Sequence, residues 1–168
     1  GHARWNLPEA VKIAQALEPY DIMWLEEIIP PDNVESYARL KSQTKLKLCV
    51  SERLFTRFGF HRVVEENAAD IIMPDMAWTG GISETRKIAT MAETYYAGLA
   101  PHNPYGPLAT AVCVHIDFAS PNFVIQTCDA ENGDGTGGSP LGEFDNEPNA
   151  ELSFAGAGAF SFANRGVD

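Results

Sequence analysis

The sequence predicts an α/β fold of the (β/α)-barrel type, with about five parallel strands and helices between them. Five apolar stretches each end in a polar residue, and successive ends are 26, 23, 27 and 25 residues apart. A repeat of about 25 residues holds one strand and one helix. Short apolar strands separated by helices are typical of a parallel sheet that helices cover. The residues at the five ends are Glu26, Glu52, Asp75, His102 and Thr127.

The first repeat begins with a helix expected over residues 8–17, where Pro8 suits the opening turn. Its apolar residues recur on one face at helical spacing: Val11, Ala14 and Leu17. An apolar strand is expected at 22–26. The next helix follows two prolines, with Asp32 as the expected cap and Glu35 three residues later in a capping-box pattern.

The remaining elements alternate in the same way, because apolar runs are followed each time by apolar residues at helical spacing. Strands are expected at 46–50, at 71–73, around Leu99 and at 123–126, and helices at 58–67, 82–96 and 108–119. The expected buried residues of the first two of these helices are Phe60, Val63 and Val64, and Thr85, Ile88, Ala89, Ala92 and Tyr96.

Charge and glycine content divide the chain into two parts, residues 1–127 and residues 128–168. The first part holds 15 acidic and 11 basic residues. The second holds 8 acidic residues, one basic residue and 8 of the 14 glycines. Turn-forming residues recur throughout this second part without a long periodic run, so we expect a loop-rich acidic tail.

The overall composition excludes several classes of protein. A net charge of −11 argues against nucleic acid or an anionic membrane surface as a partner. No apolar run approaches the roughly 20 residues of a membrane span, and no signal-peptide pattern opens the sequence. The three cysteines make no disulfide framework, so we expect reduced thiols and a cytoplasmic protein.

The residues at the strand ends form an ordered series of motifs: WLEE, SERLFTR, PD with TGGISETRKIA, APHNPYGPL and PNFVIQ. This series resembles the enolase superfamily, in its mandelate racemase/muconate lactonizing enzyme subgroup. The most similar branch is the sugar-acid dehydratases of the galactonate type. The resemblance implies the carboxyl-terminal part of a (β/α)8 barrel, beginning just after the third barrel strand and ending at the eighth.

The resemblance also implies a Mg²⁺ cofactor, held by acidic ligands at successive strand ends. Glu26 and Glu52 match two of the three metal ligands. Glu27 directly follows Glu26, and adjacent strand residues point to opposite faces. The remaining ligand would precede Gly1. Hard carboxylate oxygens suit Mg²⁺, which neutralises the charge of an enediolate formed when a proton α to a carboxylate is removed.

Asp75 and His102 match the catalytic pair of the family. The resemblance implies that His102 takes the α-proton of a sugar acid and that Asp75 orients it, because a neighbouring carboxylate fixes the tautomer of an imidazole. Thr127 stands where the family often has a glutamate. His2 lies near the expected position of the acid that protonates the leaving hydroxyl group, but it does not match the family pattern and carries no assigned role.

Several interpretations stay open at this point. Arg53 suits either a substrate or a neighbouring carboxylate. Gly80 and Gly81 suit a tight turn into a helix better than an anion site. Two classes of function compete: a Mg²⁺-dependent dehydratase, with racemase or cycloisomerase chemistry as siblings, and a non-catalytic truncated or degenerate barrel homologue. Open strand edges favour a homo-oligomer or another form of self-association.

Overall fold

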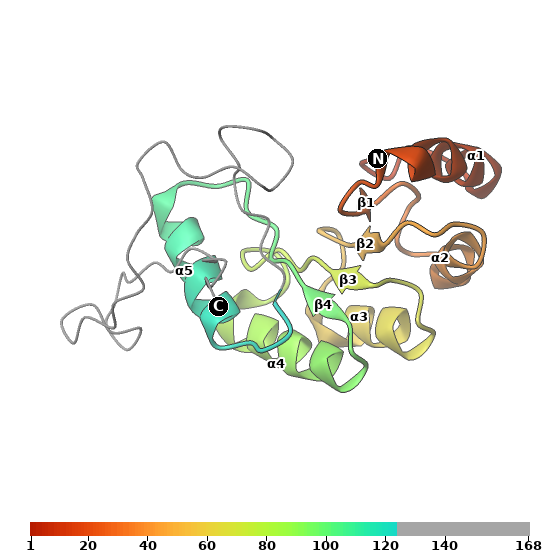
Figure 1. Cartoon of the computed structure of the whole chain (residues 1–168). Coiled ribbons are helices and arrows are strands. Elements are labelled where there is room, and N and C mark those ends of the chain that lie inside the picture. The colour runs from red at the N-terminus through yellow and green to blue at the C-terminus, as the bar shows by residue number, and fades with distance from the viewer. Residues whose placement is uncertain (124–168) are drawn as a thin grey trace, which may run out of the picture. The chain divides into compact units, whose positions relative to one another are not determined.

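The computed structural model of the chain describes residues 1–123, where four strands form one parallel sheet (Figure 1). The strands are β1 (Leu25–Glu26), β2 (Leu48–Val50), β3 (Ile71–Ile72) and β4 (Gly98–Leu99). They pair in chain order, β1-β2-β3-β4, and each pairing is parallel. This arrangement confirms the predicted α/β fold of barrel type.

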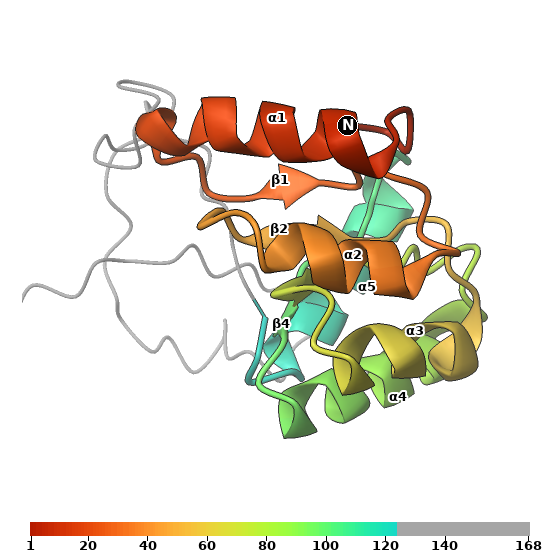
Figure 2. The ribbon, with the colours of Figure 1, turned by 90° about the vertical axis from the view of Figure 1, so that its right-hand side faces the viewer.

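The helices alternate with the strands. They are α1 (Leu7–Leu17), α2 (Val34–Lys41), α3 (Thr56–Glu65), α4 (Gly81–Thr94) and α5 (Pro107–Phe118), with a short 3₁₀ turn, η1 (Glu18–Tyr20), after α1. Neighbouring helices pack against one another, most extensively α3 with α4, and also α1 with α2 and α4 with α5. Figures 1 and 2 show that α1 to α4 follow the strands along one side of the sheet. None of the helices in residues 1–123 is long and apolar enough to cross a membrane.

The fifth expected strand is described only at its first residue. Phe123 forms a parallel bridge with Leu99 of β4, which is the pairing that a fifth strand beside β4 requires. Residues 124–126 lie outside the described residues. So do Thr127, Cys128 and the tail expected at 128–168, so the predicted division of the chain at residue 127 stays a prediction.

The sheet has two differently packed faces, because successive strand residues point to opposite sides. Leu48 and Val50 of β2 pack into the large core that the helices cover. Cys49, between them, packs on the other face. That smaller apolar cluster consists of Cys49, Ile71 and Met73, with Trp24 and Ala100 against it. All three residues of β2 are fully buried, so this strand is covered on both sides.

The core between sheet and helices supplies most of the apolar burial. Its largest fully buried side chains include Tyr37, Phe60, Leu48, Ile88 and Leu99. Each aliphatic or phenylalanine side chain of this kind contributes about 1.5–3 kcal/mol through burial. The predicted inward faces of 58–67 and 82–96 are confirmed for Phe60, Val63, Val64, Thr85, Ile88, Ala89 and Ala92.

Helix ends differ from the sequence prediction at several places. The cap of α2 is Asn33 rather than Asp32, and its side chain accepts a hydrogen bond from the Ser36 N–H at 3.0 Å. Helix α3 begins at Thr56, two residues earlier than expected. The early start is stabilised by Glu84 of α4, whose Oε1 accepts a hydrogen bond from the N–H of Arg57 at 3.0 Å.

The prediction that Tyr96 faces inward is wrong. Helix α4 ends at Thr94, and Tyr96 takes a left-handed backbone conformation with φ of 58°. The chain therefore leaves the helix before this residue, whose side chain is 97% exposed. At the other end of α4, Gly80 and Gly81 have φ of 123° and 80°, a region that favours glycine. This supports a tight turn into the helix.

Candidate active site at the carboxyl ends of the strands

The four predicted site residues in the described part of the chain all follow the carboxyl ends of strands. Glu26 is the last residue of β1, and Glu52 comes two residues after β2. Asp75 and His102 each come three residues after their strands, β3 and β4. Because all four strands are parallel, these residues lie at one edge of the sheet.

Asp75 and His102 are joined both through the backbone and through their side chains. The residues form a parallel β-bridge beyond the ends of β3 and β4, and the N–H of His102 donates to the carbonyl of Pro74 at 3.1 Å. Nδ1 of His102 lies 2.9 Å from Oδ2 of Asp75. The other carboxylate oxygen, Oδ1, accepts the N–H of Ala77 at 2.9 Å. Asp75 is 3% exposed, so this carboxylate is held away from solvent and hydrogen-bonded at both oxygens.

The second ring nitrogen of His102 faces Glu52. Nε2 lies 3.1 Å from Oε2 of Glu52, so the imidazole stands between two carboxylates. With Nδ1–H donated to Asp75, Nε2 is the ring nitrogen that is left to take or give a proton. The structure thus brings Glu52, Asp75 and His102 into one continuous set of contacts.

Glu27 anchors a buried charged cluster beneath Glu52. Glu27 is 1% exposed, and its Oε1 accepts a hydrogen bond from Nε of Arg53 at 2.5 Å. Oε2 accepts the N–H of Glu52 at 3.1 Å and the hydroxyl of Ser51. A buried carboxylate is stable only with such partners. The cluster fixes the backbone that carries Glu52.

Arg53 pairs with carboxylates in this structure. Besides its bond to Glu27, Nη2 lies 3.4 Å from Oε1 of Glu52. Nδ1 of His2 lies 3.4 Å from the same Glu52 oxygen, so the amino-terminal segment reaches the site as well. These contacts agree with the interpretation of Arg53 as a partner of a neighbouring carboxylate, and its contact with a substrate stays a prediction.

Glu26 stands apart from this set of contacts. Its Oε2 accepts a hydrogen bond from Nε1 of Trp24 at 3.4 Å. Among residues 1–123, no hydrogen bond or ion pair joins Glu26 to Glu52 or His102, and no group of three or more histidine, cysteine or acidic residues is arranged to hold a metal ion. Glu26 and Glu52 nonetheless offer the hard oxygen ligands that suit Mg²⁺, from neighbouring strands.

Tyr105 also belongs to the site, although no sequence pattern predicted a role for it. The hydroxyl of Tyr105 donates to Oδ2 of Asp75 at 3.0 Å. The ring of Trp78 stacks on Phe55 with the centroids 6.3 Å apart. A tyrosine three residues after His102 gives no local signal, because its contact with Asp75 spans 30 residues of sequence.

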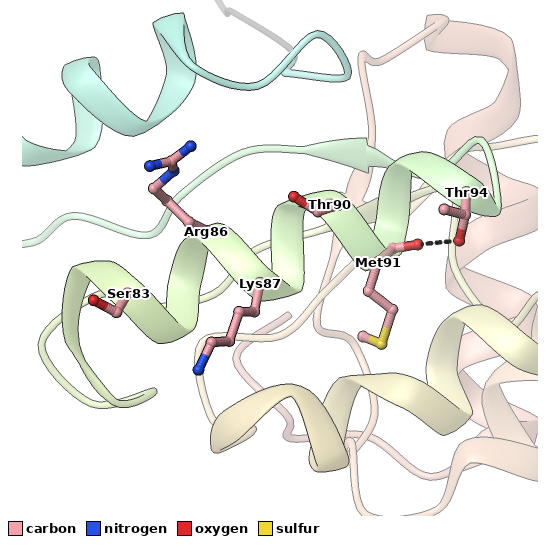
Figure 3. Close-up of a pocket in the computed structure, with 6 residues that line it drawn as sticks. All are labelled: Ser83, Arg86, Lys87, Thr90, Met91 and Thr94. Carbon is pink, nitrogen blue, oxygen red and sulfur yellow. Dashed lines mark hydrogen bonds between the residues drawn. The ribbon is translucent and has the colours of Figure 1, made fainter.

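A surface hollow outside this site lies along α4 (Figure 3). Its lining residues are Ser83, Arg86, Lys87, Thr90, Met91 and Thr94, all from that one helix. None of the four strand-end residues contributes to it, so it is not the place where the predicted chemistry would occur.

Comparison with known proteins decides the family. Residues 1–145 match the family described as Enolase C-terminal domain-like. The chain belongs to this enolase family. The match confirms the resemblance expected from the motifs.

The enolase-family relatives include dehydratases. Over 125 residues the chain is 48% identical to a D-galactonate dehydratase of Ralstonia nicotianae and 46% identical to one of Cronobacter sakazakii. Each alignment covers 74% of this chain and 33% of the relative. The chain thus spans about a third of the length of these curated relatives.

Solved enolase-family structures agree with the fold. An enolase from Agrobacterium radiobacter, with bound Na and L-malate, superposes with a TM-score of 0.70 at 43% identity, over 73% of this chain and 31% of that one. A mandelate racemase/muconate lactonizing enzyme-like protein from Rubrobacter xylanophilus gives a TM-score of 0.71 at 37% identity, over 74% and 32% of the two chains.

Proposed function

We propose that this chain supplies the proton-abstracting part of a Mg²⁺-dependent sugar-acid dehydratase site. The observation that carries the proposal is the imidazole of His102, held at Nδ1 by Asp75 and facing Glu52 through Nε2. Similarity to two D-galactonate dehydratases favours a hexonate-type sugar acid as substrate. Racemase and cycloisomerase reactions also begin with removal of the α-proton, so His102 and Asp75 alone do not distinguish them from dehydration. The substrate class therefore rests on the two dehydratase relatives.

In the proposed reaction, Nε2 of His102 takes the proton from the carbon next to the substrate carboxylate. The electrons of that C–H bond move into an enediolate. A second acid, which we expect from outside residues 1–123, protonates the β-hydroxyl group as its C–O bond breaks, so that the group leaves as water. The resulting enol then converts to a 2-keto acid. Asp75 holds the ring so that Nδ1 keeps its proton and Nε2 is left to take the α-proton.

Glu26 and Glu52 would hold the Mg²⁺ ion. A bound Mg²⁺ neutralises negative charge on the substrate carboxylate as the α-proton leaves. The cluster of Glu27, Ser51 and Arg53 fixes the backbone at Glu52 and so sets where this ligand stands. Two carboxylates alone bind Mg²⁺ weakly, and we expect the third ligand to come from outside residues 1–123.

One alternative has an observation in its favour. Within the described part of the chain no group of three ligands is arranged to hold a metal, which fits a non-catalytic barrel homologue. The two functions differ in whether His102 and its neighbours support turnover once a complete set of ligands is present.

A chimera tests the proposal. The residues of this chain that match the D-galactonate dehydratase of Ralstonia nicotianae would replace the corresponding 125 residues of that relative. We expect the chimera to form a 2-keto acid from D-galactonate, to lose this activity with EDTA and to regain it with Mg²⁺. A chimera that folds with the parent's secondary structure but forms no 2-keto acid would favour the non-catalytic homologue.

A further inference from the structure

The carboxylate of Asp75 has a second side-chain donor besides His102. Oδ2 accepts the hydroxyl of Tyr105 at 3.0 Å and also lies 2.9 Å from Nδ1 of His102. With the Ala77 N–H on Oδ1, the carboxylate has three donors, two of them on the oxygen that faces His102. A carboxylate can rotate about its terminal torsion, which is broad, so the number and direction of its donors decide its orientation.

Tyr105 is held in place by the loop that carries it. The loop runs from His102 to α5, and the N–H of Tyr105 donates to Oδ1 of Asn103 at 3.3 Å. The amide of Asn103 donates in turn to Oγ1 of Thr110 at 2.7 Å, in the first turn of α5. The backbone of Tyr105 is thus tied through two hydrogen bonds to a helix, and the residue is 41% exposed.

The hydroxyl of Tyr105 stays protonated and can therefore donate. Partial desolvation of the phenol, and then its hydrogen bond to Asp75 and the charge of that carboxylate, raise the pKa of Tyr105 above its ordinary value. The phenol donates to an ionised acceptor, a pairing stronger than one between neutral groups. The contact therefore restrains Asp75 wherever Asp75 is ionised.

We propose that Tyr105 is a positioning residue, whose hydroxyl fixes the Asp75 carboxylate in the orientation that presents Oδ2 to Nδ1 of His102. The catalytic consequence rests on the proposed function, in which His102 takes the α-proton. The hydrogen-bond arrangement itself does not rest on it. Without the Tyr105 hydroxyl, the Ala77 N–H and His102 remain as donors, and the bond between Asp75 and His102 is less firmly held.

The test uses the full 168-residue chain labelled with ¹⁵N-histidine, without substrate or metal. Tyr105→Phe removes only the hydroxyl group, and Tyr96→Phe removes one from a side chain that is 97% exposed. His102→Asn assigns the signals of His102 among the four histidines. The readouts are the ring ¹⁵N shifts, which report the tautomer, and the rate at which the Nδ1 proton of His102 exchanges with water.

We expect Tyr105→Phe to speed exchange of the His102 Nδ1 proton by roughly twofold to tenfold, the range that loss of one ordinary hydrogen bond implies. The ring ¹⁵N shifts of His102 should move in the same variant, and Tyr96→Phe should change neither. Unchanged shifts and exchange in Tyr105→Phe would overturn the proposal. These readouts need no turnover, so a dehydratase assay can fail while the positioning role stands, and the reverse also holds.

A reciprocal measurement covers the case in which Tyr105→Phe disturbs the loop. With ¹³C at the Cζ atom of tyrosine, Asp75→Asn should shift the signal of Tyr105 and leave that of Tyr96 in place. Tyr105→Phe assigns its signal. If Asp75→Asn leaves the Tyr105 signal unmoved, the hydroxyl does not donate to Asp75 and the proposal is wrong.

Discussion

Nδ1 of His102 lies 2.9 Å from Oδ2 of Asp75, and the same two residues form a parallel β-bridge beyond the ends of their strands. Backbone pairing therefore sets the distance at which the side chains meet. A ring held in this way keeps its tautomer, and Nε2 stays directed toward Glu52. The pairing of Asp75 with His102 is the basis of the proposed proton transfer, and single substitutions can test it.

We expect Asp75→Asn to lower kcat of the chimera by about 100-fold or more, the scale on which an oriented general base contributes. A carboxylate only accepts hydrogen bonds and so keeps the proton on Nδ1 of the imidazole. An asparagine amide also donates, so it no longer fixes this tautomer. Steady-state kinetics measure the loss, and circular dichroism checks the fold. Asp32→Asn, at an exposed carboxylate, is the matched control and should leave kcat unchanged. A kcat within a fewfold of the parent in Asp75→Asn would mean that Asp75 does not orient His102.

The buried carboxylate of Glu27 should contribute to stability through its partners. Glu27→Gln leaves Arg53, Ser51 and the Glu52 N–H without their charged acceptor, whereas Glu9→Gln disturbs only an exposed pair with Lys12. We expect a loss of roughly 1–3 kcal/mol in the free energy of unfolding for Glu27→Gln, reduced from a fully buried pair because Arg53 is partly exposed. Glu9→Gln should cost under about 0.5 kcal/mol. Urea unfolding compares the two, and equal midpoints would contradict a stabilising role for the Glu27 cluster.

Asp117 on α5 should make stability depend on pH. Burial raises the pKa of Asp117 from 3.8 to about 7, and its Oδ1 is buried without a hydrogen-bond partner in the described part of the chain. The folded state thus favours the protonated carboxyl more than the unfolded state does. The stability that the protonated Asp117 carboxyl gives the folded state is fully present below pH 3.8 and is lost as the pH rises through about 7.

The variant Asp117→Asn isolates this effect. Wild type and variant should differ most at pH 8, where the variant is expected to be more stable by roughly 1–4 kcal/mol, because each pH unit between the two pKa values corresponds to about 1.4 kcal/mol. The advantage should shrink as the pH falls toward 4. Denaturant unfolding at the two pH values measures it, and Asp21→Asn, at an exposed carboxyl, is the control. A difference that stays the same at both pH values would rule out titration of Asp117 as its cause.

The sequence predicted the repeat and the strand-end residues because both follow from local patterns. Apolar runs and helical spacing placed four of the strands and the buried faces of α3 and α4. The start of α3 could not be predicted from local patterns, because it depends on Glu84 of the next helix, which accepts the Arg57 N–H. Tyr105 was missed for the same reason, because its partner Asp75 is 30 residues away and only the folded chain joins them.

The isolated chain should bind Mg²⁺ weakly and associate with itself. Glu26 and Glu52 are its only predicted metal ligands, and β1 pairs through one edge, with β2, within residues 1–123. A sheet that does not close favours contact with a second copy, although residues 1–5 donate backbone hydrogen bonds along the free side of β1. Calorimetric titration with Mg²⁺ and analytical ultracentrifugation measure both properties. A monomer that binds Mg²⁺ in the micromolar range would contradict this expectation.

The central claim is that His102 takes the α-proton, and deuterium exchange tests it most directly. The chimera and its His102→Asn variant would each be incubated with D-galactonate and Mg²⁺ in D₂O, with proton NMR following the α-position of recovered substrate and the C3 position of the 2-keto acid. We predict that the parent chimera incorporates deuterium into product and that His102→Asn shows neither product nor α-exchange, while circular dichroism shows the same fold. Exchange at the parent rate in His102→Asn would show that another group takes the proton.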